Sequence, residues 1–124
     1  MKTAISSSCF YPMPTENTLE KIASLGFSTA EIFINTIGEA TREFLKEIKR
    51  RADFYGISID SVHTPLGFAE PNYFFSSYKR RTEESLALYE RIFDAVSVTE
   101  TKLFNFHGDF LAYNNPVERD IEIY

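Results

Sequence analysis

Two histidines, His63 and His107, are the side chains of this sequence best suited to chemistry. They are the only histidines among its 124 residues, and each ends a short run, S-V-H and F-N-F-H. A neutral imidazole can bind Zn²⁺, Mn²⁺ or Fe²⁺, form hydrogen bonds with a hydroxyl group, or transfer a proton near neutral pH. The pair therefore predicts a metal or substrate site. The alternative is that both are hydrogen-bonded polar residues at the rim of the core.

Glu31 is a third ionisable side chain of interest, because it lies within the apolar run A-E-I-F-I-N. An unpaired carboxylate in such a strand is costly. Side chains alternate between the two faces of a strand, so Glu31 points away from the face that carries Ile32. Two interpretations remain open. Glu31 orients a histidine or a substrate hydroxyl, or it pairs with a lysine or arginine of a helix.

Strand and helix patterns alternate along the chain and must position these three residues. The first three predicted strands begin at residues 3, 30 and 57, which gives two equal intervals of 27 residues. This is the length of a compact βα unit, and parallel strands with right-handed crossovers fit it. We expect strands at 3–8, 30–35, 57–63 and 102–107, and helices at 17–25, 44–55 and 81–98.

Three local patterns add to this expectation. The run from Asn17 to Glu20 resembles a capping box and predicts the start of the first helix. Residues 64–78 contain several proline, glycine and aromatic residues, and we expect them to form a long connection without regular structure. The run N-N-P from Asn114 predicts the start of a fourth helix.

These patterns predict an α/β protein with a parallel sheet, either open and doubly wound or part of a closed barrel. Neither of the phosphate-binding patterns G-x-G-x-x-G and G-x-x-x-x-G-K-[ST] occurs in the sequence, which argues against the open sheet and against a nucleotide cofactor. Barrels place their chemistry at the carboxyl ends of the strands. His63 and His107 are predicted to lie there, and Glu31 lies on the second strand.

Three segments resemble the first half of the xylose isomerase-like TIM-barrel superfamily, which includes sugar-phosphate isomerases and epimerases and the endonuclease IV-like proteins. They are L-G-F-S-T-A-E-I-F (25–33), S-V-H-T-P (61–65) and F-N-F-H-G (104–108). A full (β/α)8 barrel needs ~250 residues. We therefore expect residues 1–124 to form a single partial barrel domain, with about four of the eight units, that ends within the fourth helix.

The resemblance implies an isomerase or epimerase of a small sugar or sugar phosphate that uses a divalent metal, Mn, Zn, Mg or Co. Glu31, His63 and His107 would be its catalytic residues in this half, and the two histidines would also bind the metal. The acid/base carboxylates would lie beyond residue 124, so we expect the chain to be inactive alone. Two alternatives stay open: an endonuclease IV-like phosphodiesterase, and a non-catalytic half-barrel that forms a homodimer or binds a complementary half.

Two further residues are candidate substrate ligands. Phe68 follows the third strand, and its ring would stack on the apolar face of a sugar or pack against other parts of the protein. Lys79 opens the basic run K-R-R at a predicted helix start, where positive charge opposes the helix dipole unless an anion is bound. Lys79 is therefore a candidate ligand of a sugar phosphate, and the alternative is a solvated, salt-bridging helix face.

Charge and cysteine content narrow the class of partner. The chain has 13 basic and 18 acidic residues and a formal net charge of −5, which argues against binding to nucleic acid or to an anionic membrane. The single cysteine, Cys9, excludes an intrachain disulfide, and the sequence contains no long apolar stretch. We expect a cytoplasmic protein whose partner, from the resemblance, is a small carbohydrate.

Overall fold

Four short strands form one parallel sheet. The structure is a computed structural model and describes residues 3–108. The strands lie in the order β1-β2-β3-β4, and every neighbouring pair is parallel, which confirms the predicted α/β class. The order follows the chain without a reversal, unlike that of a doubly wound sheet. The strands are β1 (Ile5–Ser6), β2 (Thr29–Phe33), β3 (Ser58–His63) and β4 (Leu103–Asn105).

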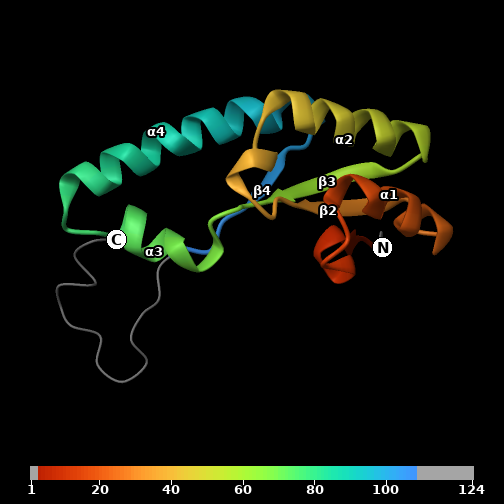
Figure 1. Cartoon of the computed structure of the whole chain (residues 1–124), viewed down its shortest axis with the longest axis horizontal. Helices are drawn as coiled ribbons and strands as arrows, with labels where there is room; N and C mark the ends of the chain where they lie inside the picture. Colours follow the sequence, from red (N-terminus) through yellow and green to blue (C-terminus); the bar gives the residue numbers. More distant parts are fainter. Residues whose placement is uncertain (1–2, 109–124) are drawn as a thin grey trace, which may run out of the picture.

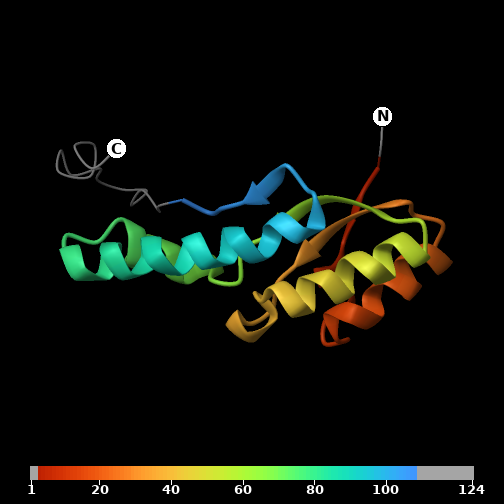
Figure 2. The same ribbon diagram turned by 90° about the horizontal axis from the view of Figure 1, so that it is seen from above.

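Three long helices cover one face of this sheet. They are α1 (Thr15–Ser24), α2 (Arg42–Phe54) and α4 (Lys79–Val96), and they lie on the same side of the strands (Figure 2). We call the opposite face of the sheet the inner face. The core fills the space between the helices and the sheet, and its buried side chains include Leu19, Ile22, Ile32, Leu45, Ile48, Val62 and Ile92.

The pairing of β2 with β3 contains an irregularity at Asp60. Ala30 pairs with Ile59, whereas the next residue, Glu31, pairs with Ser61. Asp60 is therefore an extra residue in β3, as in a β-bulge. Such an insertion shifts the alternation of side chains between the two faces by one residue.

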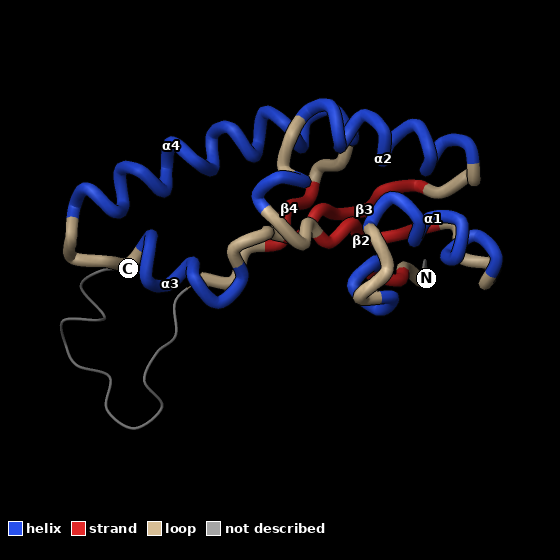
Figure 3. The backbone as a smooth tube through the Cα atoms, viewed as in Figure 1, coloured by secondary structure: helices blue, strands red, loops and turns tan. Residues whose placement is uncertain are grey.

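The connection between His63 and α4 contains a helix, contrary to the expectation of a long irregular segment. A 3-10 turn, η3 (Gly67–Ala69), leads into α3 (Glu70–Phe74). Figure 1 shows α3 below the first half of α4, and Figure 3 shows both elements extending beyond the carboxyl ends of the strands. Pro71 lies in the first turn of α3, where the missing N–H is tolerated. The prolines that suggested a loop are thus compatible with a helix start.

The predicted capping box of the first helix is wrong. α1 begins at Thr15, its N-cap is Pro14, and Pro14 makes no side-chain capping hydrogen bond. Asn17 lies inside the helix, and the hydroxyl of Thr18 donates to the carbonyl oxygen of Thr15 at 2.7 Å. In this first turn the Asn17 amide donates to the carbonyl oxygen of Pro14 at 2.9 Å. In α2, by contrast, Thr41 Oγ1 caps the helix by accepting a hydrogen bond from the Phe44 amide at 3.2 Å.

The outer strands are shorter than predicted. After β1 the chain turns into a 3-10 helix, η1 (Ser7–Phe10). β4 ends at Asn105, so His107 lies two residues beyond the strand and not at its last position. The helix expected from Asn114 lies outside the described residues. Two further 3-10 turns are η2 (Ile37–Glu39) and η4 (Ser97–Thr99).

The helices within residues 3–108 include none that is both long and apolar enough to cross a membrane.

Candidate functional site

Glu31 lies on the inner face of the sheet, between polar side chains of the neighbouring strands. Its Oε2 accepts a hydrogen bond from Ser61 Oγ at 3.3 Å and another from Asn105 Nδ2. Ile32, the next residue of β2, is fully buried on the helix side. Within residues 3–108 the partners of Glu31 are therefore neutral side chains of β3 and β4, and not a lysine or arginine of a helix.

His63 and His107 converge at the carboxyl end of the sheet. Their Nε2 atoms are 3.0 Å apart, and the two rings meet edge to face with centroids 4.8 Å apart. His63 stacks on the ring of Phe33 at 4.4 Å. These contacts bring together two residues that are 44 positions apart in the chain.

The tautomer of His63 follows from its backbone contact. His63 Nδ1 lies 3.1 Å from the carbonyl oxygen of Thr64, and a carbonyl oxygen can only accept a hydrogen bond. Nδ1 therefore carries the proton of the neutral ring, which leaves a lone pair on Nε2. That lone pair points toward His107, so His63 is prepared to accept a hydrogen bond or to bind a cation.

A buried polar network lies behind the two histidines. Glu70 is completely buried, and its Oε2 accepts a hydrogen bond from the His107 amide at 2.7 Å. Its Oε1 accepts one from the hydroxyl of Tyr89, which also lies 2.6 Å from Thr64 Oγ1. Burial, together with the hydrogen bond to Glu70, raises the pKa of Tyr89 above its usual range, so the phenol remains protonated and can donate.

The separation of the two Nε2 atoms is compatible with two ligands of one divalent ion. Metal–nitrogen bonds are ~2.0–2.1 Å long, and two nitrogens 3.0 Å apart then subtend an angle of about 90° at the ion. Within residues 3–108, no group of three or more His, Cys, Asp or Glu side chains is arranged to hold an ion. Further ligands would therefore have to be water, substrate or residues outside the described part.

Lys79, one of the two candidate substrate ligands, does not join this cluster. Lys79 is the first residue of α4, its side chain is highly exposed, and its Nζ lies 3.6 Å from Glu83 Oε1. This is the solvated, salt-bridging arrangement that the sequence offered as the alternative. Phe68 belongs to η3, and its side chain lies outside what the structure describes.

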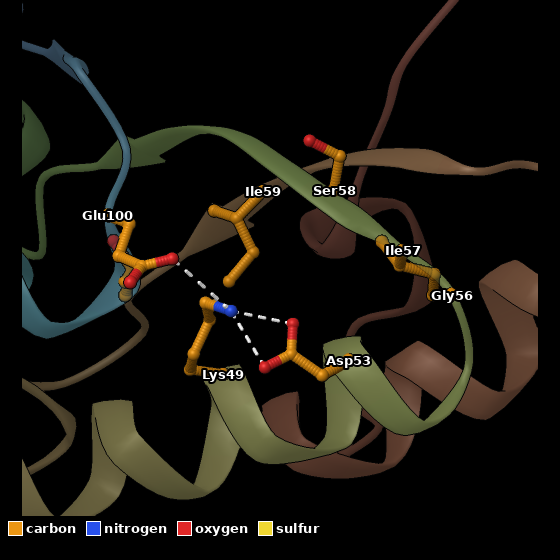
Figure 4. A pocket seen from close by; sticks show the side chains of 8 residues that line it. Lys49, Asp53, Gly56, Ile57, Ser58, Ile59 and Glu100 are labelled. Carbon is orange, nitrogen blue, oxygen red and sulfur yellow. Dashed lines mark hydrogen bonds and ion pairs between the residues drawn. The ribbon is translucent and has the colours of Figure 1, made fainter.

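A polar pocket at the other end of the sheet has no part in the candidate site. It is lined by residues of α2, the start of β3 and the turn before β4, among them Lys49, Asp53 and Glu100. Lys49 Nζ lies 2.6 Å from Asp53 Oδ1 and 3.5 Å from Glu100 Oε2 (Figure 4). In parallel barrels the amino-terminal ends of the strands serve stability and not catalysis. We therefore assign this pocket to surface ion pairing.

Five residues of the site were not identified from the sequence: Ser61, Thr64, Glu70, Tyr89 and Asn105. Ser61 and Asn105 each lie two residues before a histidine, so strand alternation is a signal that would have found them. Glu70 and Tyr89 carry no comparable signal. Glu70 precedes a proline in a segment that resembles a loop, and Tyr89 resembles an ordinary core position of an amphipathic helix.

Comparison with known proteins adds a structural relative but no sequence relative. No protein-family model matches the chain, and no curated protein matches it. The crystal structure of D-psicose 3-epimerase in the presence of D-fructose superimposes with a TM-score of 0.72 and 22% sequence identity. The match covers 99% of this chain and 46% of the epimerase chain. The chain thus spans less than half the length of this relative, and its fold is that of half a TIM barrel, as the resemblance predicts.

Proposed function

We propose that this chain supplies the amino-terminal half of a sugar isomerase or epimerase active site. The observation that carries the proposal is the meeting of His63 and His107, with Nε2 atoms 3.0 Å apart, at the carboxyl end of a parallel sheet. Parallel barrels carry their chemistry at this end. The structural likeness to a protein that acts on a small sugar supports the same conclusion.

Each inner-face residue has a role in this proposal. His63 uses the lone pair of Nε2 to bind a metal ion or to accept a hydrogen bond from a sugar hydroxyl. His107 lies beside it and contacts the same ligand. Glu31 is held by Ser61 and Asn105, and its carboxylate orients a substrate hydroxyl. A divalent ion such as Mn, Zn, Mg or Co, when bound, would polarise the carbonyl and neighbouring hydroxyl of the sugar.

The reaction also needs groups beyond those described. Moving a proton between adjacent carbons requires a general base near the substrate, and the proposal assigns it to carboxylates of the other half of the barrel. We therefore propose that residues 1–124 form one partial barrel domain that binds its ligand but does not turn it over alone. We also propose that Phe68 stacks on the apolar face of the sugar and that Lys79 binds the phosphate group of a sugar phosphate.

Titration with Co²⁺ tests the ligand assignment. We expect the chain to bind one Co²⁺, and we expect His63→Ala and His107→Ala each to weaken binding by at least ~10-fold, because each removes a nitrogen ligand. Asp53→Asn is the control, because Asp53 is an acidic residue at the opposite end of the sheet. Unchanged Co²⁺ affinity in both alanine variants would overturn the assignment.

Substrate class is tested separately by saturation-transfer NMR with D-fructose and D-psicose. We expect transfer to the sugar in the wild-type chain and its loss in His107→Ala. Transfer that is equal in both proteins would show that the sugar binds elsewhere. Binding of an abasic DNA duplex at low salt, without sugar binding, would favour the phosphodiesterase alternative despite the net charge of −5.

A further inference from the structure

We infer that Glu70 and Tyr89 are positioning residues that hold the two histidines against each other. The inference rests on the proposed function, because it explains how that site is kept in shape. Its starting point is a carboxylate that none of the proposed chemistry uses. Glu70 is fully buried, although charged side chains are rarely buried without a specific partner.

Glu70 fixes the chain on which His107 lies. Its Oε2 accepts a hydrogen bond from the His107 amide at 2.7 Å. His107 follows the end of β4, where the ladder of the sheet no longer holds the backbone. The carboxylate therefore provides an anchor just after the strand ends. The ring of His107 lies close to Gly67, since its Cε1 would be 3.7 Å from a Cβ placed there.

Tyr89 extends the same network to His63. Thr64 follows His63 directly, its carbonyl oxygen accepts the His63 Nδ1 proton, and its Oγ1 lies 2.6 Å from the Tyr89 hydroxyl. Tyr89 in turn donates to Glu70 Oε1. Thr64 is completely buried and Tyr89 nearly so, which shields the hydrogen bonds of the Tyr89 hydroxyl from water. One carboxylate is thus linked to the backbone on both sides of the histidine pair.

The hydrogen bonds run in one consistent direction. The Leu66 amide donates to Thr64 Oγ1 at 3.2 Å, so the Thr64 hydroxyl is free to donate to Tyr89, and the Tyr89 hydroxyl to Glu70. The series ends on the carboxylate, which accepts at both oxygens. Tyr89 is also held by ring contact with Phe74 of α3, with centroids 4.7 Å apart. α3 therefore places Glu70 and packs the residue that Glu70 binds.

If Glu70 and Tyr89 served packing alone, neither the carboxylate nor the hydroxyl would be needed. An apolar side chain of similar volume stabilises a buried position as well as a charge does, or better. What the charged network adds is a fixed relation between two strand ends, and the groups that it fixes are the backbone of His107 and the residue after His63. We conclude that the network sets the spacing of the imidazoles.

Three variants separate positioning from general stability. Glu70→Leu removes both acceptors and should abolish the NOE between the ring protons of His63 and His107 in the metal-free chain. It should also weaken Co²⁺ binding by ~10–100-fold. Glu70→Gln should retain the NOE, because its Oε1 accepts from the His107 amide and its Nε2 donates to the Tyr89 oxygen, whose own proton then turns to Thr64 Oγ1. Leu45→Ala destabilises the core away from the histidines and should leave the NOE and the Co²⁺ affinity unchanged.

The outcomes distinguish this inference from the proposed function. Retention of the NOE in Glu70→Leu, or its loss in Leu45→Ala as well, would overturn the inference. Failure of the wild-type chain to bind Co²⁺ would count against the proposed metal site, whereas the NOE would still test the positioning. If Glu70→Leu does not fold, Tyr89→Phe takes its place, because it keeps the ring and removes the hydroxyl. An intact NOE in Tyr89→Phe would then contradict the inference.

Discussion

Glu100 has a left-handed backbone, with φ of 61°, although glycine is the residue that adopts this conformation without strain. It follows the turn η4 and leads the chain toward β4. Its carboxylate lies 3.5 Å from Lys49 Nζ, but the side chain is 80% exposed, so this ion pair adds little stability. The backbone strain at Glu100 therefore destabilises the fold by more than the ion pair with Lys49 stabilises it.

Replacing Glu100 by glycine should stabilise the protein. We expect Glu100→Gly to raise the free energy of unfolding by about 0.5–1 kcal/mol, because it removes a left-handed side-chain residue at the expense of a weak ion pair. Urea denaturation followed by circular dichroism measures this change. Glu84→Gly is the control. Glu84 is an exposed residue in the middle of α4, and this variant should lose about 0.5–1 kcal/mol of unfolding free energy. A loss of stability in both variants would refute the argument.

At the level of single residues, the sequence predicts which side chains are of interest better than it predicts their partners. His63 and His107 are recognisable because each ends a predicted strand, and the structure brings them together. For Glu31 the sequence left open a histidine or substrate hydroxyl and a helix lysine or arginine, whereas its partners in the described residues are Ser61 and Asn105 of the neighbouring strands. The role of Glu70 depends on contacts between segments 37 residues apart, which no local pattern reveals.

Within α2, one glutamate forms ion pairs with two arginines of the same helix. Glu47 Oε1 lies 2.7 Å from Arg50 Nη2 and 2.7 Å from Arg51 Nε. The hydrogen bonds from Arg50 and then Arg51 lower the pKa of Glu47 to about 2. Arg51 also donates to the carbonyl oxygen of Glu16 at 3.1 Å, so the cluster connects α2 with α1.

The lowered pKa of Glu47 gives a pH dependence with a definite sign. Its contribution to stability is complete above the ordinary glutamate pKa of 4.5 and is lost as the pH falls toward about 2. We expect Glu47→Gln to lose less stability than the wild type as the pH falls over this range. Arg50→Ala should likewise show a smaller loss of stability. Thermal unfolding between pH 2 and pH 5 measures the effect. A pH dependence equal to that of the wild type in Glu47→Gln would contradict it.

At the level of elements, helices with regular apolar spacing could be predicted from the sequence, and α3 could not. α2 and α4 lie within a few residues of their expected positions, because their buried residues recur at helical intervals. α3 is too short to show such a period, and Pro71 and Gly67 in and before it are typical of loops. Its existence depends on the burial of Glu70 and on the packing of Phe74 against Tyr89, which are tertiary effects.

The whole molecule has two unequal faces. The helix side of the sheet is covered by α1, α2 and α4, whereas no described helix lies on the inner face (Figure 2). Leu103 projects from β4 on the inner face and is 56% exposed. In a closed barrel the inner face is buried by the remaining strands. We therefore propose that the partner of this face is a complementary half-barrel, or a second copy of the chain when no such half is present.

Sedimentation velocity tests this proposal. We expect the isolated chain to sediment as a dimer or larger species, and we expect Leu103→Glu to shift it toward the monomer, because it places a charge on the inner face. Leu25→Glu is the matched control: Leu25 is 51% exposed at the end of α1, on the helix side, and should have no effect. A stable monomer in the wild-type protein would exclude self-association.

The extra residue in β3 decides which face of the sheet carries His63. In a regular strand, His63 would share a face with Ile59 and point toward the helices, since the two residues are four positions apart. Because Asp60 is inserted between the partners of Ala30 and Glu31, the side chains of Ile59 and His63 lie on opposite faces of the sheet. The single added residue, Asp60, thus turns the imidazole of His63 to the inner face of the sheet. If β3 kept Asp60 within a regular ladder, His63 would turn toward the helices and the inner face would lose its imidazole, although no residue had changed.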